Sequence, residues 1–260
     1  MVGFGTPDLA SSYVLALTTK SGCAPPFSPP KAGAFSIRLY KNQRILQFCS
    51  RHRTDATNLS DSAWVHPPEP AALVAIYRRC GTRRTVSRGQ VLKSGGQEPR
   101  LFFQEKGLCA YEVAEELKGR PSVLSLITPR RTMGDITCLT GDVVNVRSVA
   151  WQKSTVLEVD PRAVHEECLL HPPLLLEWAR HIMRKEESHL EGMVANFTLP
   201  PAMRLKIFLR VLFEGYGLEL KDGENVVPLL LTADRIGSVV NLTRMSVSKL
   251  FFRSGSARAL

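Results

Sequence analysis

The chain has 260 residues, of which 44% are hydrophobic and 22% are charged, a composition typical of a globular protein with one large domain or two smaller ones. No apolar run reaches the ~20 residues that cross a bilayer. The apolar patch near the N-terminus has no basic lead-in, so we expect neither a membrane partner nor a secretory signal. The net charge of +10 favours a polyanionic partner such as nucleic acid.

The six cysteines are spread singly along the chain, and no CxxC pair occurs: Cys23, Cys49, Cys80, Cys109, Cys138 and Cys168. This predicts reduced thiols of a cytoplasmic protein rather than a disulfide framework or a clustered metal site. We also find no catalytic triad, no paired carboxylates and no phosphate-binding loop. The sequence therefore predicts no catalytic residues, no metal site and no enzyme.

Residues 1–69 differ from the rest because of their proline content. The run "SGCAPPFSPPKAGAF" holds four prolines and two glycines, and "HPPEPAA" follows at His66. Proline interrupts both helices and sheet ladders, so we expect a poorly ordered extension. The stretch "FSIRLYKNQRILQFCSRH" within it is compatible with a strand or a short helix.

Residues 70–170 begin with a short helix, "AALVAIYRRC", and then change to short apolar runs separated by glycines, as at Gly89, Gly95 and Gly107. Apolar and polar positions alternate through "VVNVRSVA". Many short strands with turn residues between them indicate an antiparallel barrel or roll. Together with the helices that follow, this predicts the α+β class.

A long helix is predicted within residues 171–199. Apolar residues recur along it in alternating steps of three and four, interrupted only by Glu186, which is the pattern of a coiled-coil seam. The apolar members are Leu176, Ala179, Met183, Leu190, Met193 and Phe197. The seam predicts pairing with the same helix of a second copy.

Residues 200–260 contain a second amphipathic helix, "AMRLKIFLRVLFEGYG", and then "LTADRIGSVVNLTRMSVSKLF". Asn241 stands at a sharp turn between two short helices, and Thr243 can cap the second one. Arg244, Met245, Ser248 and Lys249 then form its polar, basic outer face. This is the pattern of a helix-turn-helix whose second helix can enter a DNA major groove; a helical hairpin packed on another element is the alternative.

In this order, the elements of residues 70–251 resemble the Crp–Fnr superfamily of bacterial transcription factors. "GQVLKSGGQEPRLFFQEKG" resembles the first hairpin of that family's roll, and "MGDITCL" is similar to its phosphate-binding cassette. The resemblance implies an N-terminal cyclic-nucleotide-binding-like jelly roll, a dimerisation helix and a C-terminal helix-turn-helix. The family's reading helix is followed by a β-hairpin wing, for which "FFRSGSARAL" is too short, so we expect an incomplete or truncated wing.

By this resemblance, an effector would bind at Gly134, Asp135, Val144 and Asn145. Val144 stands where the family's cyclic-nucleotide binders have an arginine, and a valine cannot neutralise a phosphate. Cyclic AMP is therefore not the expected effector, and the small molecule stays unidentified. The spacing of Cys23 and Cys49 does not match the family's iron–sulfur branch.

Haem is an alternative cofactor that the resemblance suggests, with a ligand among His165, His171, His181 and His189. A lone histidine is more often a satisfied structural residue than a ligand.

The resemblance assigns DNA binding to Thr243, Arg244, Met245, Ser248 and Lys249. Methionine at position 245 offers a base only apolar contact, and Lys249 offers no bidentate contact to guanine. We expect a homodimeric, effector-responsive regulator that binds a pseudo-palindromic double-stranded operator, with RNA polymerase as a further partner. The alternative is a dimeric small-molecule-binding roll whose DNA-binding head is vestigial or truncated.

Overall fold

The computed structural model describes residues 13–18, 35–41, 63–94, 99–113, 122–142, 146–216, 218–219 and 224–256. The chain forms two compact units. The larger unit comprises Leu59–Tyr216 and Asp234–Val247, and the smaller one comprises Met1–Asn58, Gly217–Ala233 and Ser248–Leu260. The region predicted as one domain at 200–260 is therefore divided between both units.

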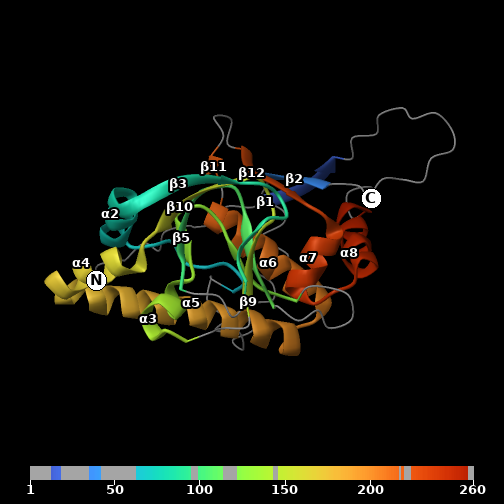
Figure 1. The fold of residues 1–260 in the computed structure, drawn as a ribbon. Helices are drawn as coiled ribbons and strands as arrows, with labels where there is room; N and C mark the ends of the chain where they lie inside the picture. Colours follow the sequence, from blue (N-terminus) through green and yellow to red (C-terminus); the bar gives the residue numbers. More distant parts are fainter. Residues whose placement is uncertain are drawn as a thin grey trace, which may run out of the picture. The chain divides into compact units, whose positions relative to one another are not determined.

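The larger unit contains an antiparallel β-roll of two four-stranded sheets (Figure 1). One sheet has the order β3 (Gly81–Val86), β10 (Ser154–Val159), β5 (Leu101–Lys106) and β8 (Arg131–Met133). The other has the order β4 (Val91–Lys93), β9 (Val146–Ala150), β6 (Cys109–Val113) and β7 (Val123–Ile127). Apolar residues from both sheets share one core, which includes Phe102, Ile127 and Val156. The predicted α+β class and antiparallel roll are confirmed.

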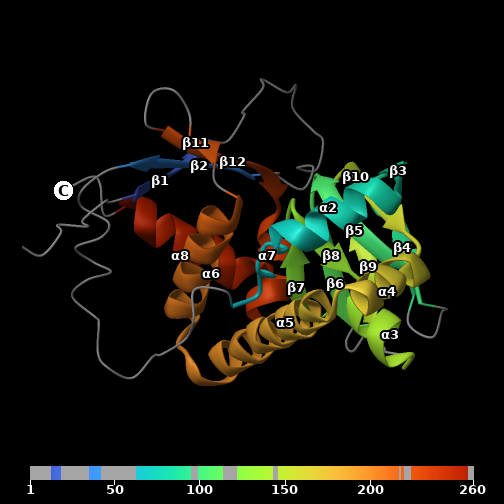
Figure 2. The ribbon, with the colours of Figure 1, turned by 90° about the vertical axis from the view of Figure 1, so that its left-hand side faces the viewer.

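Three helices pack against the roll, and Figure 2 shows them beside its strands. They are α2 (Ala71–Cys80), α4 (Pro161–Leu170) and α5 (Pro172–Thr198). A second core, which includes Tyr77, Phe103, Leu157 and Trp178, joins them to the first sheet. The bounds of α5 lie within one residue of the predicted range 171–199.

The C-terminal boundary of the predicted poorly ordered extension, residues 1–69, is wrong, because residues 63–69 belong to the larger unit. Trp64 is 1% exposed, and its ring meets that of Phe208 edge-on at 6.1 Å between centroids. Although prolines interrupt this segment, His66 N donates to Leu126 O and Glu69 N donates to Arg130 O. The residues between the prolines can therefore pair with the roll, which composition alone does not reveal.

The smaller unit contains an antiparallel sheet with the strand order β1-β2-β12-β11. Its strands are β1 (Tyr13–Thr18), β2 (Phe35–Lys41), β12 (Glu224–Leu231) and β11 (Leu218–Glu219). Of the two alternatives for "FSIRLYK", the strand is the one observed. The proline-rich run at 21–34 lies outside the described residues.

Three helices complete the C-terminal region: α6 (Pro201–Tyr216), α7 (Ala233–Val240) and α8 (Arg244–Ser256). Within the described part of the chain, no helix combines the length and the apolar character that a membrane crossing requires.

Candidate functional site

The turn between α7 and α8 has the geometry of a helix-turn-helix. Asn241 adopts a φ of 50°, the left-handed conformation that asparagine tolerates. Leu242 N donates to Gly237 O at 2.9 Å, which closes the turn onto α7. A Cβ at Gly237 would lie 2.3 Å from Leu242 O, so only glycine permits this approach. The inward residues Ile236, Val239 and Val240 are all buried.

The first turns of α8 present the side chains that were predicted to bind DNA. Thr243 Oγ1 accepts a hydrogen bond from Ser246 N at 3.1 Å, which confirms its capping role. Arg244, Met245 and Lys249 are exposed, and Ser248 is half-buried. Val247 is buried on the opposite face. The chain therefore offers a basic helix face to a partner, while DNA binding by these residues stays a prediction.

Helix α5 carries two different stripes. Five of the six apolar seam residues are exposed to solvent, from Met193 at 39% to Phe197 at 86% exposure, whereas Ala179 is half-buried. The opposite face is buried and consists of Trp178, His181, Ile182, Lys185, Ser188, His189, Gly192 and Ala195. One face of the helix thus packs on the roll, whereas the other remains available to a second chain.

The C-terminal end of α5 and the start of α6 bind the end of α7. Asn196 Nδ2 donates to Val239 O at 3.1 Å. Arg204 Nη1 lies within hydrogen-bonding distance of three carbonyl oxygens, those of Asn196, Val240 and Asn241, at 3.3, 3.0 and 3.2 Å. These contacts satisfy carbonyl groups at the C-terminal end of α7, which lack partners within their own helix.

The predicted effector site begins at the turn between β8 and α3 (Asp135–Thr140). Gly134 has a φ of +89°, and a Cβ there would lie 2.0 Å from Arg100 O. Gly134 N donates to Tyr111 Oη at 2.8 Å. The turn at Gly134 and Asp135 is thus fixed by contacts with the roll. Val144 and Asn145 lie outside the described residues.

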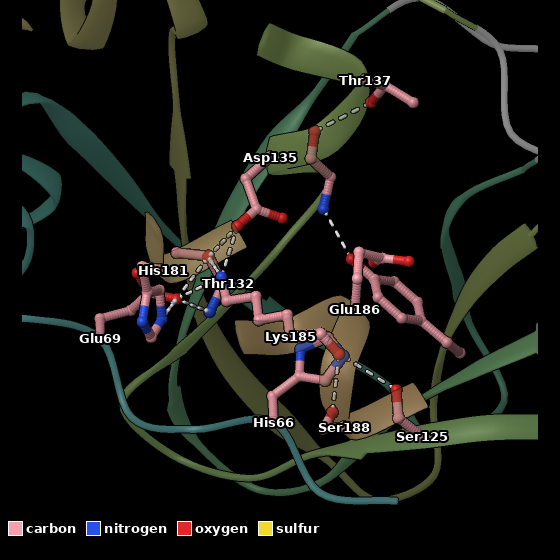
Figure 3. A network of polar contacts seen from close by, with 12 residues as sticks. His66, Glu69, Ser125, Thr132, Asp135, Thr137, His181, Lys185, Glu186 and Ser188 are labelled. Carbon is pink, nitrogen blue, oxygen red and sulfur yellow. Dashed lines mark hydrogen bonds and ion pairs between the residues drawn. The ribbon is translucent and has the colours of Figure 1, made fainter. Parts of the chain in front are cut away.

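Asp135 does not face open solvent, since it is 1% exposed and is bound by side chains from the roll and α5 (Figure 3). Lys185 Nζ donates to Asp135 Oδ2 and pairs with Glu69 Oε1. Thr132 Oγ1 accepts a hydrogen bond from Lys185 and lies 2.6 Å from Glu69 Oε1. We call Glu69, Thr132, Asp135 and Lys185 the buried ion cluster.

Within the buried ion cluster, Glu69 and Lys185 stabilise each other's charged form. Burial alone would raise the pKa of Glu69, but the charge of Lys185, followed by the neighbouring His181, lowers it to about 2. Burial alone would lower the pKa of Lys185, yet the carboxylates of Asp135 and Glu69 raise it above its usual value. His181 Nε2 lies 3.1 Å from Glu69 Oε1. A buried charge of this kind is tolerated only when it is paired.

A second polar group joins α5 to the roll beside the buried ion cluster. His66 Nε2 lies 2.8 Å from His189 Nε2, and each is 2.9 Å from Ser125 Oγ. The Tyr111 ring meets the His66 ring edge-on, with 5.2 Å between centroids. Burial, followed by the charges of His189, Lys185, Arg131 and His181, lowers the pKa of His66 well below its usual value.

Three of the four histidines named as possible haem ligands already contact other side chains. His181 pairs with Glu69, and both nitrogens of His189 lie near polar partners, Nε2 by His66 and Ser125, Nδ1 by Glu186 at 3.2 Å. The His165 ring packs on Trp178 with 5.5 Å between centroids. His171 is exposed at the start of α5. Haem coordination by a buried histidine would require these contacts to break.

Sequence reasoning missed Lys93, a cation beside α3. Its Nζ donates to Thr137 Oγ1, and its side chain is buried. Burial lowers the pKa of Lys93. Although Val144 supplies no charge, a lysine from β4 does lie at the predicted cassette. Among the described residues, no group of three or more His, Cys, Asp or Glu side chains could hold a metal ion.

The inward stripe of α5 is the sequence signal from which the burial of Lys185 could have been predicted. Trp178, Ile182, Lys185 and His189 follow each other in steps of four, three and four on the side opposite the seam. A lysine within such a stripe indicates a buried charge that needs a partner. Glu69 and Thr132, its partners, carry no comparable signal in the sequence.

Comparison with known proteins gives matches among solved structures alone: no family model matches the chain, and no curated protein does. FixK2 from Bradyrhizobium japonicum matches with a TM-score of 0.58 at 12% identity, covering 68% of this chain and 85% of its own. TTHA1359, a CRP/FNR-family transcriptional regulator from Thermus thermophilus, matches with a TM-score of 0.52 at 18% identity, covering 68% and 87%.

A third match is CLP, a c-di-GMP-responsive global regulator from Xanthomonas campestris. Its TM-score is 0.54 at 12% identity, and the match covers 72% of this chain and 93% of CLP. This chain therefore has the fold of the Crp–Fnr regulators.

Proposed function

We propose that this chain is a homodimeric, effector-responsive transcription regulator of the Crp–Fnr type, which binds double-stranded DNA through α8. The observation that carries the proposal is the helix-turn-helix itself. Its inner residues are buried and its turn is closed at Gly237, while Arg244, Met245 and Lys249 are exposed at the start of α8. Residues at the N-terminal end of a recognition helix are those that reach base edges.

The side chains of α8 differ in what they can contribute to DNA binding. Arg244 and Lys249 can donate hydrogen bonds to phosphate or to guanine acceptors. Met245, which is 67% exposed, can only contact an apolar group such as a thymine methyl. Thr243 Oγ1 caps the helix, and Ser248 can bind phosphate. Phosphate contacts would supply much of the affinity and make it fall with salt.

The exposed stripe of α5 supports the homodimer. Leu176, Met183, Leu190 and Phe197 lie on one face at coiled-coil spacing and are each at least half exposed. A second copy of α5 would bury this stripe by knobs-into-holes packing. Two reading helices related by a two-fold axis would then lie about 34 Å apart, one turn of DNA.

The effector is proposed to act on the roll near Gly134 and Lys93, and through α5 on the helix-turn-helix. Helix α5 contributes Lys185 to the buried ion cluster and contacts α7 through Asn196. A ligand that favours one position of α5 would shift the population of the DNA-binding state. Cyclic AMP is not the proposed effector. Contact with RNA polymerase and a cytoplasmic location belong to the same proposal.

Selection from a random duplex library tests the proposed function. Immobilised protein is mixed with a library of random 30-base-pair duplexes, and the bound DNA is sequenced over successive rounds. We expect an enriched two-fold repeat whose half-site centres are about 10 base pairs apart. A library that stays random after selection would instead favour a small-molecule-binding roll with a vestigial DNA-binding head.

A further inference from the structure

The acidic part of the predicted effector site is already occupied by the protein. Lys185 Nζ contacts Asp135, Glu69 and Thr132, and Asp135 and Lys185 are each 1% exposed. An incoming ligand cannot reach the Asp135 carboxylate unless this ammonium group moves. The cation that would satisfy the two carboxylates is therefore supplied by α5.

The elements that Lys185 joins are far apart in the sequence. Glu69 precedes α2, Thr132 lies in β8, Asp135 is the first residue of α3, and Lys185 lies near the middle of α5. The ammonium group thus makes the contacts expected of a ligand bound between the roll and the long helix. Because the carboxylates are buried, the loss of Lys185 removes the cation that compensates their charge, and a replacement ammonium group would restore that compensation.

The same helix also contacts the helix-turn-helix. Asn196 lies about three turns from Lys185 along α5, and its Nδ2 donates to Val239 O of α7. Arg204 of α6 donates to the carbonyl oxygens of Val240 and Asn241. A change in the position of α5 on the roll would therefore alter the contacts that α5 makes with α7.

We propose that Lys185 is an internal ligand: its ammonium group fills a cation subsite formed by Asp135 and Glu69 and thereby holds α5 in the DNA-binding position, so that no diffusible ligand is needed at that subsite. This inference rests on the proposed function for its effect on DNA. The existence of the cation subsite does not depend on DNA binding. The subsite takes a primary ammonium group, because three oxygen acceptors converge on Nζ.

The test is chemical rescue of Lys185→Ala by propylammonium, which replaces the three methylenes and the ammonium group that the substitution removes. Thermal unfolding and affinity for a selected duplex are measured with and without the amine. Tetramethylammonium, which has the charge but no N–H donor, and propanol, which has the size but no charge, are the control additives. Arg184→Ala, which removes an exposed cation from the neighbouring position of α5, is the control variant.

We expect Lys185→Ala to lower the unfolding midpoint by about 10 °C and to weaken duplex binding at least tenfold. Millimolar propylammonium should restore both quantities, whereas the control additives should restore neither. The wild-type protein and Arg184→Ala should not respond to the amine. A folded Lys185→Ala that ignores propylammonium would overturn the cation subsite. Restored stability with unchanged duplex affinity would overturn the effect on DNA.

Two outcomes separate this inference from the proposed function. If the wild-type protein selects no duplex, the proposed function fails, and the thermal response to propylammonium still decides whether the subsite exists. If Lys185→Ala does not fold, acetylation of wild-type lysines by an N-hydroxysuccinimide ester, read by mass spectrometry, decides the matter. Lys185 should react at least 100-fold more slowly than exposed Lys249, and equal rates would contradict the inference.

Discussion

Lys185 and Asn196 lie on the same inward side of α5 and bind different parts of the larger unit. Lys185 pairs with Asp135 and Glu69 of the roll, and Asn196 Nδ2 donates to the carbonyl oxygen of Val239, near the end of α7. The helix is continuous from Pro172 to Thr198. It therefore connects the predicted effector region to the predicted DNA-binding element without an intervening loop.

Replacement of Arg204 by methionine tests the junction of α6 and α7. Arg204 Nη1 lies 3.0 Å from Val240 O and 3.2 Å from Asn241 O. Since methionine has no donor, we expect Arg204→Met to lower the free energy of unfolding by about 1–2 kcal/mol. Urea denaturation followed by circular dichroism measures the change. Arg184→Met, at an exposed position of α5, should change it by less than about 0.5 kcal/mol.

Gly237→Ala tests the closure of the helix-turn-helix. Because a Cβ at this position would lie 2.3 Å from Leu242 O, the backbone of the turn has to move. Although alanine favours the helix, we expect the free energy of unfolding to fall by about 1–3 kcal/mol. We also expect weaker duplex binding. Anisotropy titrations and urea denaturation give both quantities. Ser238→Ala, the next residue of α7, is the control, and a Gly237→Ala protein with wild-type affinity would disprove this account of the turn.

Leu190→Glu tests the exposed stripe of α5 as a dimer seam. Leu190 is 57% exposed in the single chain, so a glutamate should be compatible with the fold of the monomer. In a paired coiled coil the two glutamates would face each other, and we expect the dimer to dissociate at micromolar concentration. Sedimentation velocity reports the mass. Arg184→Glu, off the seam on the same helix, should leave the dimer intact; a dimeric Leu190→Glu would refute the predicted seam.

The pH dependence of stability tests the buried His66. The pKa of His66 is lowered in the folded protein. As the pH falls below the ordinary histidine pKa near 6.5, His66 therefore binds a proton in the unfolded chain but not in the folded protein. The free energy of unfolding should fall as the pH drops. For one histidine that stays neutral in the folded protein, the free energy of unfolding falls by about 2 kcal/mol between pH 7 and pH 5.

His66→Gln isolates this contribution, because His181, His189 and Lys185 of α5, Arg131 of β8 and Tyr111 of β6 surround the ring and remain in place. The variant should lose less stability than the wild type between pH 7 and pH 5 in urea denaturation. Parallel pH profiles for the two proteins would show that His66 titrates freely in the folded state.

Local patterns in the sequence predicted the elements that one segment specifies by itself. The turn at Asn241, the cap at Thr243 and the long helix α5 each depend on residues within a few turns of one another. The roll followed from short strands separated by glycines. Each of these signals reflects a period or a backbone preference that is readable without tertiary contacts.

The buried ion cluster could not be predicted in this way, because Glu69, Asp135 and Lys185 come from three distant segments. The proline content before α2 indicated an extension, yet Trp64 and His66 are buried against α5 and the roll. The Cβ of Gly192 would meet Trp64 Cδ1 at 2.6 Å, so this segment and the helix are fitted closely. A contact between a non-repetitive segment and a helix leaves no periodic signal.

Helix α8 is predicted to read DNA sequence through Arg244 and Lys249. We would measure fluorescence anisotropy of a selected pseudo-palindromic duplex and of a random duplex at two salt concentrations. The proteins would be the wild type, Arg244→Ala/Lys249→Ala and the control Arg184→Ala/Arg180→Ala. We predict tight binding of the selected duplex, weakened about 100-fold by the α8 substitutions and unaffected by the control. Equal affinity for both duplexes, or unchanged affinity in the α8 variant, would contradict the claim.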